Sequence, residues 1–161
     1  MTIIAVYSPE EGKDKESKIF YQNLQEVLDK TNKNDIIMLA GDLNARVGNV
    51  PIQNVVGTNG EITKNINGNR LIDFASYNEL KILNTFFKHK DIHKFTWRER
   101  GSHSIIDYVI VNRTATNLAQ DVRVFRGSDV SSDHFLVVAK FILHARWKKT
   151  PEEKKDSRRK I

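Results

Sequence analysis

Short apolar runs alternate along this chain with segments of helical periodicity, and this alternation limits the folds that it can adopt. Residues 3–7 form an apolar run that stops at Ser8 and Pro9, as a buried strand ending in a loop does. Residues 19–28 repeat their apolar side chains at helical spacing, and residues 35–40 form a second apolar run. Strands and helices in alternation predict a domain of the α/β class.

The rest of the chain continues this alternation after one long interruption. Residues 45–67 are rich in Gly and Asn and lack periodicity, which predicts a long loop that is functional or mobile. Residues 68–80 have near-helical spacing of apolar side chains, which predicts a helix. The further strands are predicted at residues 81–85, 95–98, 104–111, 121–126 and 135–143. Turn residues at 100–102 predict that the second and third of these form a hairpin.

The net charge of the chain is +6, but it is concentrated at one end. Residues 144–161 hold eight basic and three acidic residues and so carry +5, which leaves +1 for residues 1–143. We therefore predict one domain over residues 1–143 and a basic, disordered tail over residues 144–161. A basic patch of the nuclear-localisation kind and a short exposed helix are the alternatives for this tail. The nearly neutral body gives little support for nucleic-acid binding, so that question depends on the site.

Composition excludes several classes of protein. No apolar run is long enough to span a bilayer, and the N-terminus lacks the basic region and cleavage site of a signal peptide. The chain has no cysteine, which excludes a disulfide framework and a thiolate zinc site. We expect an intracellular protein that does not bind membranes, and the basic tail suggests the nucleus.

Polar side chains interrupt or flank the predicted strands. Asp42 and Asn44 directly follow an apolar strand, Asp107 lies inside another, and Asp133 and His134 directly precede a third. Taken singly, an Asp after a strand is more often a turn former or a helix cap than a catalyst. A lone His is usually a surface residue or a satisfied core residue. Ligands of open α/β sheets bind where strands end, however, so these residues together mark a candidate site.

Asp107 is the most informative of these residues. A carboxylate inside an apolar strand is costly to desolvate unless it is paired or hydrogen-bonded. A histidine is a suitable partner, because carboxylate–imidazole pairing fixes the tautomer and orients the ring. The sequence therefore predicts a dyad of Asp107 and His134.

Four segments of the chain carry a resemblance to a known family. They are, in order, Ala5–Pro9, Gly41–Ala45, Ser104–Tyr108 and Ser132–His134. Together they resemble the later motifs of the endonuclease/exonuclease/phosphatase superfamily. Gly41–Gly48, Asn67–Phe74 and Thr96–Trp97 are similar to endonuclease domains of LINE-type non-LTR retrotransposons and to craniofacial-development-protein-2-like proteins. The resemblance covers roughly residues 2–143.

The resemblance implies a fold of the deoxyribonuclease and apurinic-endonuclease type. This is an α/β (α+β) fold, a four-layer α/β/β/α sandwich, which we expect to be truncated here at its N-terminal side. The upstream half of the family domain contributes strands and core to the sandwich. Exposed strand edges and apolar surface should then lead to self-association or to completion by an upstream segment.

The resemblance also implies roles for five side chains in phosphodiester hydrolysis. His134, held by Asp107, is expected to contact the scissile phosphate and to activate water or stabilise developing charge. Asp42 is expected to act as a base or to position the nucleophile. Asn44 is expected to orient that nucleophile and to donate a hydrogen bond to the phosphate, and Tyr7 to place its hydroxyl near it.

A divalent cation is also implied by the resemblance. Asp133 is expected to help hold Mg²⁺, with Mn²⁺ as the alternative. In the family, an asparagine and a glutamate upstream of the tyrosine strand precede these motifs, and the glutamate is the principal metal ligand. Met1 stands only six positions before Tyr7, so we expect the cation to be weakly bound.

The segment before the predicted turn resembles the part of the family that faces DNA. Trp97, Arg98 and Arg100 could stack on bases or grip phosphates. The alternative is a half-buried aromatic side chain in a hairpin with two solvated arginines.

Three functions remain open at this point. The first is a Mg²⁺-dependent DNA endonuclease of retrotransposon type, impaired by loss of the upstream ligand. The second is a catalytically inactive, truncated or domesticated domain that acts through protein or chromatin interaction. The third is a phosphodiesterase or phosphatase acting on a phosphoinositide-like substrate.

Overall fold

The computed structural model of the protein describes residues 1–32, 34–127 and 132–143. Its elements in chain order are β1 Thr2–Tyr7, α1 Asp14–Asp29, β2 Ile37–Asp42, α2 Ile66–Tyr77, β3 Leu80–Ile82, η1 Leu83–Thr85, η2 Asp91–His93, β4 Trp97–Glu99, β5 Ser102–Ser104, β6 Asp107–Asn112, α3 Arg113–Thr116, β7 Ala119–Phe125 and β8 Leu136–Phe141. The tail predicted at residues 144–161 lies outside the described residues. Among the described helices, none is long and apolar enough to cross a membrane.

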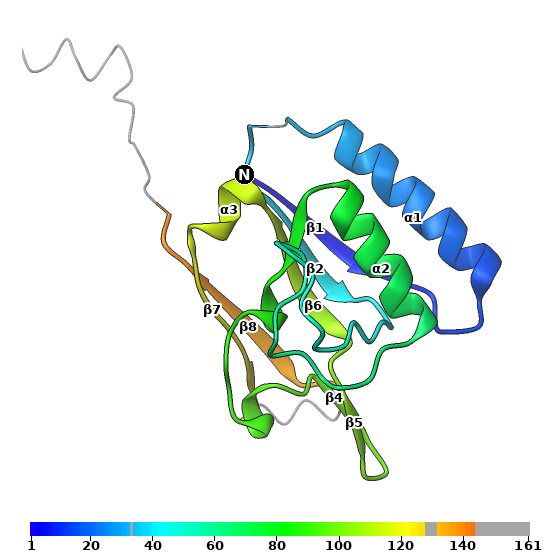
Figure 1. Ribbon diagram of the computed structural model, residues 1–161, viewed down its shortest axis with the longest axis vertical. Helices are drawn as coiled ribbons and strands as arrows, with labels where there is room; N and C mark the ends of the chain where they lie inside the picture. Colours follow the sequence, from blue (N-terminus) through cyan, green and yellow to red (C-terminus); the bar gives the residue numbers. More distant parts are fainter. Residues whose placement is uncertain (33, 128–131, 144–161) are drawn as a thin grey trace, which may run out of the picture.

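The largest sheet has the strand order β1-β2-β6-β3 and is covered on one face by α1 and α2 (Figure 1). β1 runs parallel to β2, and β6 runs antiparallel to both β2 and β3. Leu24 and Leu28 of α1 and Leu71 of α2 pack with Leu39 and Ile110 of the sheet in one buried cluster. The apolar runs of the sequence become strands because this cluster removes them from water on the helix side.

A second sheet, formed by β7 and β8, packs on the other face of the first (Figure 1). Val122 and Val137 of this sheet join Met38, Val109 and Val111 of the first sheet in a second buried cluster. Helices, a first sheet and a second sheet therefore follow one another as layers. This arrangement confirms the predicted α/β class and the face-to-face packing of two sheets.

The predicted hairpin exists but is short. β4 pairs with β5 through the turn at Arg100 and Gly101, whose φ angles are +46° and +87°. Two successive positive φ angles match the right-handed twist of the flanking strands in a two-residue turn. The turn prediction is confirmed.

The prediction of one strand over residues 104–111 is wrong. The hairpin ends at Ser104, and β6 begins at Asp107 in the four-stranded sheet. The hydroxyl of Thr96 accepts hydrogen bonds from the N–H groups of Ile106 at 3.0 Å and Asp107 at 3.1 Å. These side-chain bonds replace ladder bonds and let the chain pass from one sheet to the next.

The long segment predicted as a functional or mobile loop, residues 45–67, is packed into the protein. Ala45, Val47 and Val56 are buried members of the core cluster. Asn65 ends the segment by capping α2, since its side chain accepts a hydrogen bond from the N–H of Gly68. This cap explains why the helix begins two residues before the predicted start.

Strand β3 is shorter than the predicted strand over residues 81–85. The chain turns into a single 3-10 turn at Leu83–Thr85. The hydroxyl of Thr85 donates to the backbone oxygen of Ile82 at 2.7 Å, and Asn84 directs its side chain toward β6. Polar side chains that bond to nearby backbone groups favour a turn over continued pairing.

Candidate active site

Three of the predicted site residues lie in one row across the first sheet. Tyr7 of β1 is paired in register with Asp42 of β2, and Asp42 is paired with Asp107 of β6. Residues directly opposite each other on neighbouring strands point to the same face of a sheet. The three side chains therefore share the face that points away from α1 and α2. Tyr7 stands at the outer end of the row and is 70% exposed.

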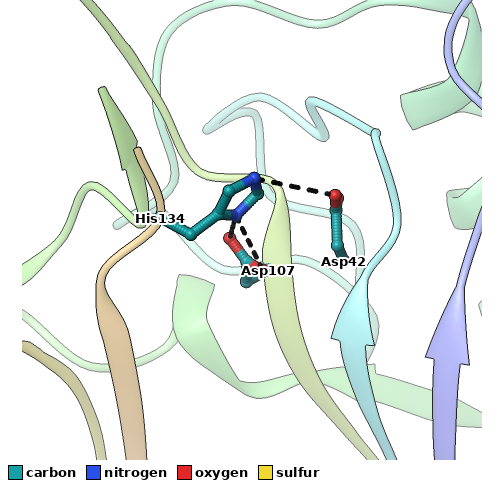
Figure 2. A group of neighbouring side chains, drawn as sticks. All are labelled: Asp42, Asp107 and His134. Carbon is teal, nitrogen blue, oxygen red and sulfur yellow. Dashed lines mark hydrogen bonds and ion pairs between the residues drawn. The ribbon is translucent and has the colours of Figure 1, made fainter. Parts of the chain in front are cut away.

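His134 reaches this row from the segment before β8 (Figure 2). Its Nδ1 lies 3.0 Å and 3.2 Å from the two carboxylate oxygens of Asp107, and its Nε2 lies 3.9 Å from Oδ2 of Asp42. An ionised carboxylate can only accept, so Nδ1 donates its proton to Asp107 and leaves Nε2 facing Asp42. The dyad of Asp107 and His134 is present in the structure, and Asp42 makes it a cluster of three.

The backbone of β4 holds the segment that carries His134. The N–H of Phe135 donates to the backbone oxygen of Thr96 at 2.7 Å. The N–H of Arg98 donates to the backbone oxygen of Asp133 at 2.9 Å. These two bonds flank His134, which forms a β-bridge with Trp97. The imidazole is thus anchored from a separate hairpin and directed at the sheet.

Two buried polar residues that the sequence did not single out hold Asp107. Asn84 donates to the backbone oxygen of Asp107 at 3.1 Å and accepts from the N–H of Val109 at 2.9 Å. Thr96 accepts from the N–H of Asp107 and has no exposed surface. Both are polar residues beside apolar ones, but their bonds to Asp107 join positions 23 and 11 residues apart, which the sequence does not show.

Asn44 lies close to the row but uses its side chain to hold a neighbouring loop. Its backbone has a positive φ of 45°, and its N–H donates to Oδ1 of Asp42 at 2.8 Å. Its side-chain amide donates to the backbone oxygen of Ser8 at 2.9 Å. Asn67, the last residue of the segment predicted as a long loop, is buried and donates to the backbone oxygens of Asn44 and Pro9. Asn44 thus orients Asp42, and a role at the phosphate stays a prediction.

The structure brings Asp133 to Trp97. The indole N–H of Trp97 donates to Oδ2 of Asp133 at 2.7 Å, and this hydrogen bond lowers the pKa of the Asp133 carboxyl. Arg98 and Arg100 are exposed on the hairpin and its turn. The metal role predicted for Asp133 and the DNA contacts predicted for the hairpin residues stay predictions.

Among the described residues, the side chains of Asp42, Asp107 and His134 could together hold a metal ion. One potential ligand atom from each lies within 4.8 Å of the other two. Two carboxylates and an imidazole form a donor set that suits a divalent cation. Asp42 is half-buried, so a cation beside it would offset the cost of burying its charge. The residues present therefore fit a divalent-metal site.

Known protein families show which family this chain belongs to. The model of the family described as endonuclease-reverse transcriptase matches residues 1–138, which is most of the chain and includes the whole cluster. The chain belongs to this family. Its membership in the endonuclease/exonuclease/phosphatase group, predicted from the motifs, is confirmed.

Two curated proteins are similar to this endonuclease-reverse transcriptase family chain. They are craniofacial development protein 2 of Tragulus javanicus and of Bos taurus, each 37% identical over 149 residues. The match covers 89% of this chain but only 25% of either relative. The chain thus spans a quarter of the length of these proteins.

Solved structures share the fold. The 3′ phosphatase NExo from Neisseria, bound to product DNA hairpin, has a TM-score of 0.65 and 19% identity, over 88% of this chain and 61% of that one. The endonuclease domain of TRAS1, a telomere-specific non-LTR retrotransposon, has a TM-score of 0.60 and 22% identity, over 86% of this chain and 57% of that one. At these identities the likeness establishes the fold of the family chain and confirms the predicted fold type.

Burial raises the pKa of the Asp42 carboxyl above its ordinary value. The negative charges of Asp107 and Asp133 add to this rise, while the N–H of Asn44 and the imidazole of His134 oppose it. A carboxyl whose pKa is higher in the folded than in the unfolded protein lowers stability at pH values above that pKa. This loss of stability disappears as the pH falls through the pKa that the carboxyl has in the folded protein. The folded protein then takes up the proton before the unfolded protein does.

We therefore expect the Asp42→Asn variant of the family chain to melt at a higher temperature than the wild type at pH 8 in EDTA. The amide oxygen can still accept from Asn44, but the buried charge is gone. Thermal melts at a series of pH values should show this difference shrinking toward pH 4. In Mg²⁺, the wild type should gain more stability than the variant. If the variant is less stable than the wild type at pH 8 in EDTA, the buried charge of Asp42 does not destabilise the protein, and the prediction is wrong.

Proposed function

We propose that this chain catalyses Mg²⁺-dependent hydrolysis of phosphodiester bonds in DNA, as an endonuclease of the retrotransposon type. The observation that carries the proposal is the placement of the His134 imidazole between the carboxylates of Asp107 and Asp42. The cluster stands at the carboxyl end of β2, beside the first residue of β6, and ligands of such sheets bind at the carboxyl ends of strands. Phosphodiester hydrolysis requires an activated water and groups that stabilise charge on the phosphate, and this cluster offers both.

Asp42, Asp107 and His134 have different roles in the proposed reaction because their surroundings differ. Asp42 lies beside His134, with its Oδ2 3.9 Å from Nε2, which places it to accept the proton of the attacking water or to position that water. Asp107 holds the proton of His134 on Nδ1, which leaves Nε2 directed at the space where the phosphate binds. When Nε2 also carries a proton, it donates to a phosphate oxygen and stabilises the negative charge that develops there.

The surrounding residues complete the proposed phosphate site. Tyr7 lies next to Asp42 in the same row, so its hydroxyl can reach the same phosphate. Asn44 keeps Asp42 oriented through its backbone N–H, and its side chain is our candidate for a contact to the phosphate.

Mg²⁺, with Mn²⁺ as a substitute, is the proposed cation, held by Asp42 and Asp107 with Asp133 as a further ligand. A bound cation neutralises phosphate charge. We propose that binding is weak in this chain, because Asp107 is engaged by His134 and Asp133 by Trp97. Asp42 is then the carboxylate with fewest competing side-chain partners.

DNA is the proposed substrate because of the β4–β5 hairpin, whose first strand holds the segment that carries His134. Arg98 and Arg100 are exposed on the β4–β5 hairpin, and Trp97 is on the same strand as Arg98. Guanidinium groups placed there can contact phosphates on either side of the scissile bond. Among the similar structures, NExo is bound to DNA and TRAS1 belongs to a telomere-specific retrotransposon. A nuclear location follows as part of this proposal.

The test of the proposed function compares two substrates and two reaction conditions. Purified chain is incubated with supercoiled plasmid and, separately, with a phosphoinositide, in Mg²⁺ or in EDTA. We expect Mg²⁺-dependent nicking of the plasmid and no release of phosphate from the phosphoinositide. Phosphate release alone favours the phosphoinositide alternative. DNA binding with no nicking in Mg²⁺ or Mn²⁺ contradicts catalysis and favours the inactive domain acting through protein or chromatin interaction.

We also propose that a further polypeptide segment covers the outer part of the first sheet. β1 is an edge strand of that sheet, and Ile3 and Tyr7 are 59% and 70% exposed on the face that elsewhere packs on β7 and β8. An unpaired edge beside exposed apolar side chains favours the addition of another strand. The proposed partner is a further segment of this family's domain or, for the isolated chain, a second copy of the chain.

Light scattering on the isolated chain tests this covering segment. We expect association that weakens when Ile3 is replaced by lysine on the exposed face. Ile19→Lys is the matched control, because Ile19 is 56% exposed on α1, on the other side of the sheet. A stable monomer with cooperative melting, or equal effects of both variants, contradicts the proposal.

A further inference from the structure

The hydrogen bond between Trp97 and Asp133 is a feature of the site that the proposed chemistry does not use. The indole N–H donates to Oδ2 of Asp133 at 2.7 Å. Asp133 is exposed and is the residue directly before His134 in the chain. An indole nitrogen can only donate and an ionised carboxylate can only accept, so the indole N–H of Trp97 must point at a carboxylate oxygen of Asp133.

Trp97 is joined to the His134 segment by its backbone as well as by its side chain. Its backbone forms a β-bridge with His134, and the residues on both sides of it, Thr96 and Arg98, exchange hydrogen bonds with Phe135 and Asp133. Two backbone bonds and one side-chain bond therefore fasten the chain on either side of His134 to strand β4.

We propose that Trp97 is a positioning residue, whose indole N–H holds the Asp133 carboxylate and thereby sets the direction of the His134 imidazole toward Asp42. The role rests on the proposed function, in which His134 acts on the phosphate. The side chain of Trp97 then acts through the protein, in place of the contacts to DNA bases that the sequence suggested.

The geometry of the dyad explains why this support matters. His134 is bound to Asp107 through Nδ1 alone, and a single bonded nitrogen leaves the ring free to swing about that contact. Nε2 lies 3.9 Å from Asp42, which is beyond a direct hydrogen bond. The second restraint on the ring is its own backbone, which Arg98 and Thr96 hold on either side of His134, while the indole of Trp97 holds the side chain of Asp133.

The engagement of Asp133 also affects cation binding. The indole N–H occupies Oδ2 of Asp133, so a cation at this carboxylate is left with Oδ1 or must displace the indole. Trp97 therefore limits how far Asp133 can serve as a metal ligand. This agrees with the donor set of Asp42, Asp107 and His134 in the described part of the chain.

The Trp97→Phe variant tests the role, because phenylalanine keeps an aromatic ring for stacking and removes the N–H. We expect kcat for nicking to fall by up to about 100-fold, as misplacement of a reacting group by about 1 Å does. We expect the Kd for the same DNA, measured in EDTA, to stay unchanged. Ser102→Ala is the matched control, since it alters an exposed residue of the same hairpin without removing a charge or a bond to Asp133, and kcat should stay unchanged.

Nuclear magnetic resonance of the imidazole groups supplies a readout that needs no activity. The chain has five histidines, and Trp97→Phe should move the ring resonances of His134 while those of His89 and His93 stay in place. Unmoved His134 resonances, or a Kd that weakens as much as kcat falls, overturn the positioning role. If the wild type does not nick DNA, the proposed function fails, and the His134 resonances still decide whether Trp97 positions the ring.

Discussion

Replacing His134 with alanine is expected to lower Mg²⁺-dependent nicking of supercoiled DNA by about 10³-fold, within the range for loss of a group that moves protons or stabilises charge in a transition state. The imidazole is the one member of the cluster that contacts both carboxylates, at 3.0 Å to Asp107 and 3.9 Å to Asp42. The rate is measured as conversion of supercoiled to open-circular plasmid at saturating enzyme.

Two further variants show whether the loss reflects chemistry or folding. His134→Asn keeps a donor for Asp107 but cannot exchange a proton, so its rate should be as low as that of the alanine variant. His103→Ala removes an exposed histidine of β5 and should keep the wild-type rate. Melting curves check that the His134 variants remain folded. Nicking by either of them at the wild-type rate contradicts the proposed role.

Replacing Gly41 with alanine is expected to lower the free energy of unfolding by about 2–6 kcal/mol, because strain and overpacking each cost about 1–3 kcal/mol. Gly41 has a φ of +150°, and a Cβ at this position would lie 1.9 Å from the backbone oxygen of Val6. The clash involves the backbone of the neighbouring strand, which cannot move without breaking the pairing of β1 with β2. Since Asp42 comes next, the same change should also disturb the cluster.

Urea unfolding measures this effect directly. Gly127→Ala is the matched control, because a Cβ there meets nothing within 4 Å. The control should unfold within about 0.5 kcal/mol of the wild type, as surface substitutions usually do. A Gly41 variant as stable as the control is incompatible with the close parallel pairing of β1 and β2.

The strands and the pairing of Asp107 with His134 could be predicted because their signals are local. Apolar runs near residues 3–7 and 35–40 required burial, and they became β1 and β2. Asp107 inside an apolar run required a partner, and His134 is that partner. Exposing an apolar run to water or burying an unpaired carboxylate costs much free energy. A few neighbouring residues are therefore enough to predict that the run is buried or that the carboxylate is paired.

The supports of the cluster could not be predicted because their signals are not local. Asn67 lies in a segment rich in Gly and Asn, and nothing in such a segment shows whether an amide faces water or two buried carbonyl oxygens. Thr96 bonds to residues ten and eleven positions later, which depends on the chain leaving the hairpin at Ser104. Pairing of Trp97 with Asp133 joins residues 36 positions apart.

The long segment over residues 45–67 shows the same limit for the fold. Its composition is that of a loop, yet its few apolar residues, such as Val47 and Val56, are buried in the main core. Periodicity detects regular elements, and a segment that packs without regular structure escapes it. Asn65, by contrast, ended up as a helix cap, a role that its residue type favours.

We propose that Asp107 and His134 act as one unit on a phosphodiester bond, and a double-mutant cycle measures the coupling between them. Nicking rates in Mg²⁺ are determined for the wild type, Asp107→Asn, His134→Ala and the double variant. Residues that act as a unit lose function together, so the double variant should be no slower than the slower single variant. Losses that multiply, or a wild-type rate no higher than that of the double variant, contradict the claim.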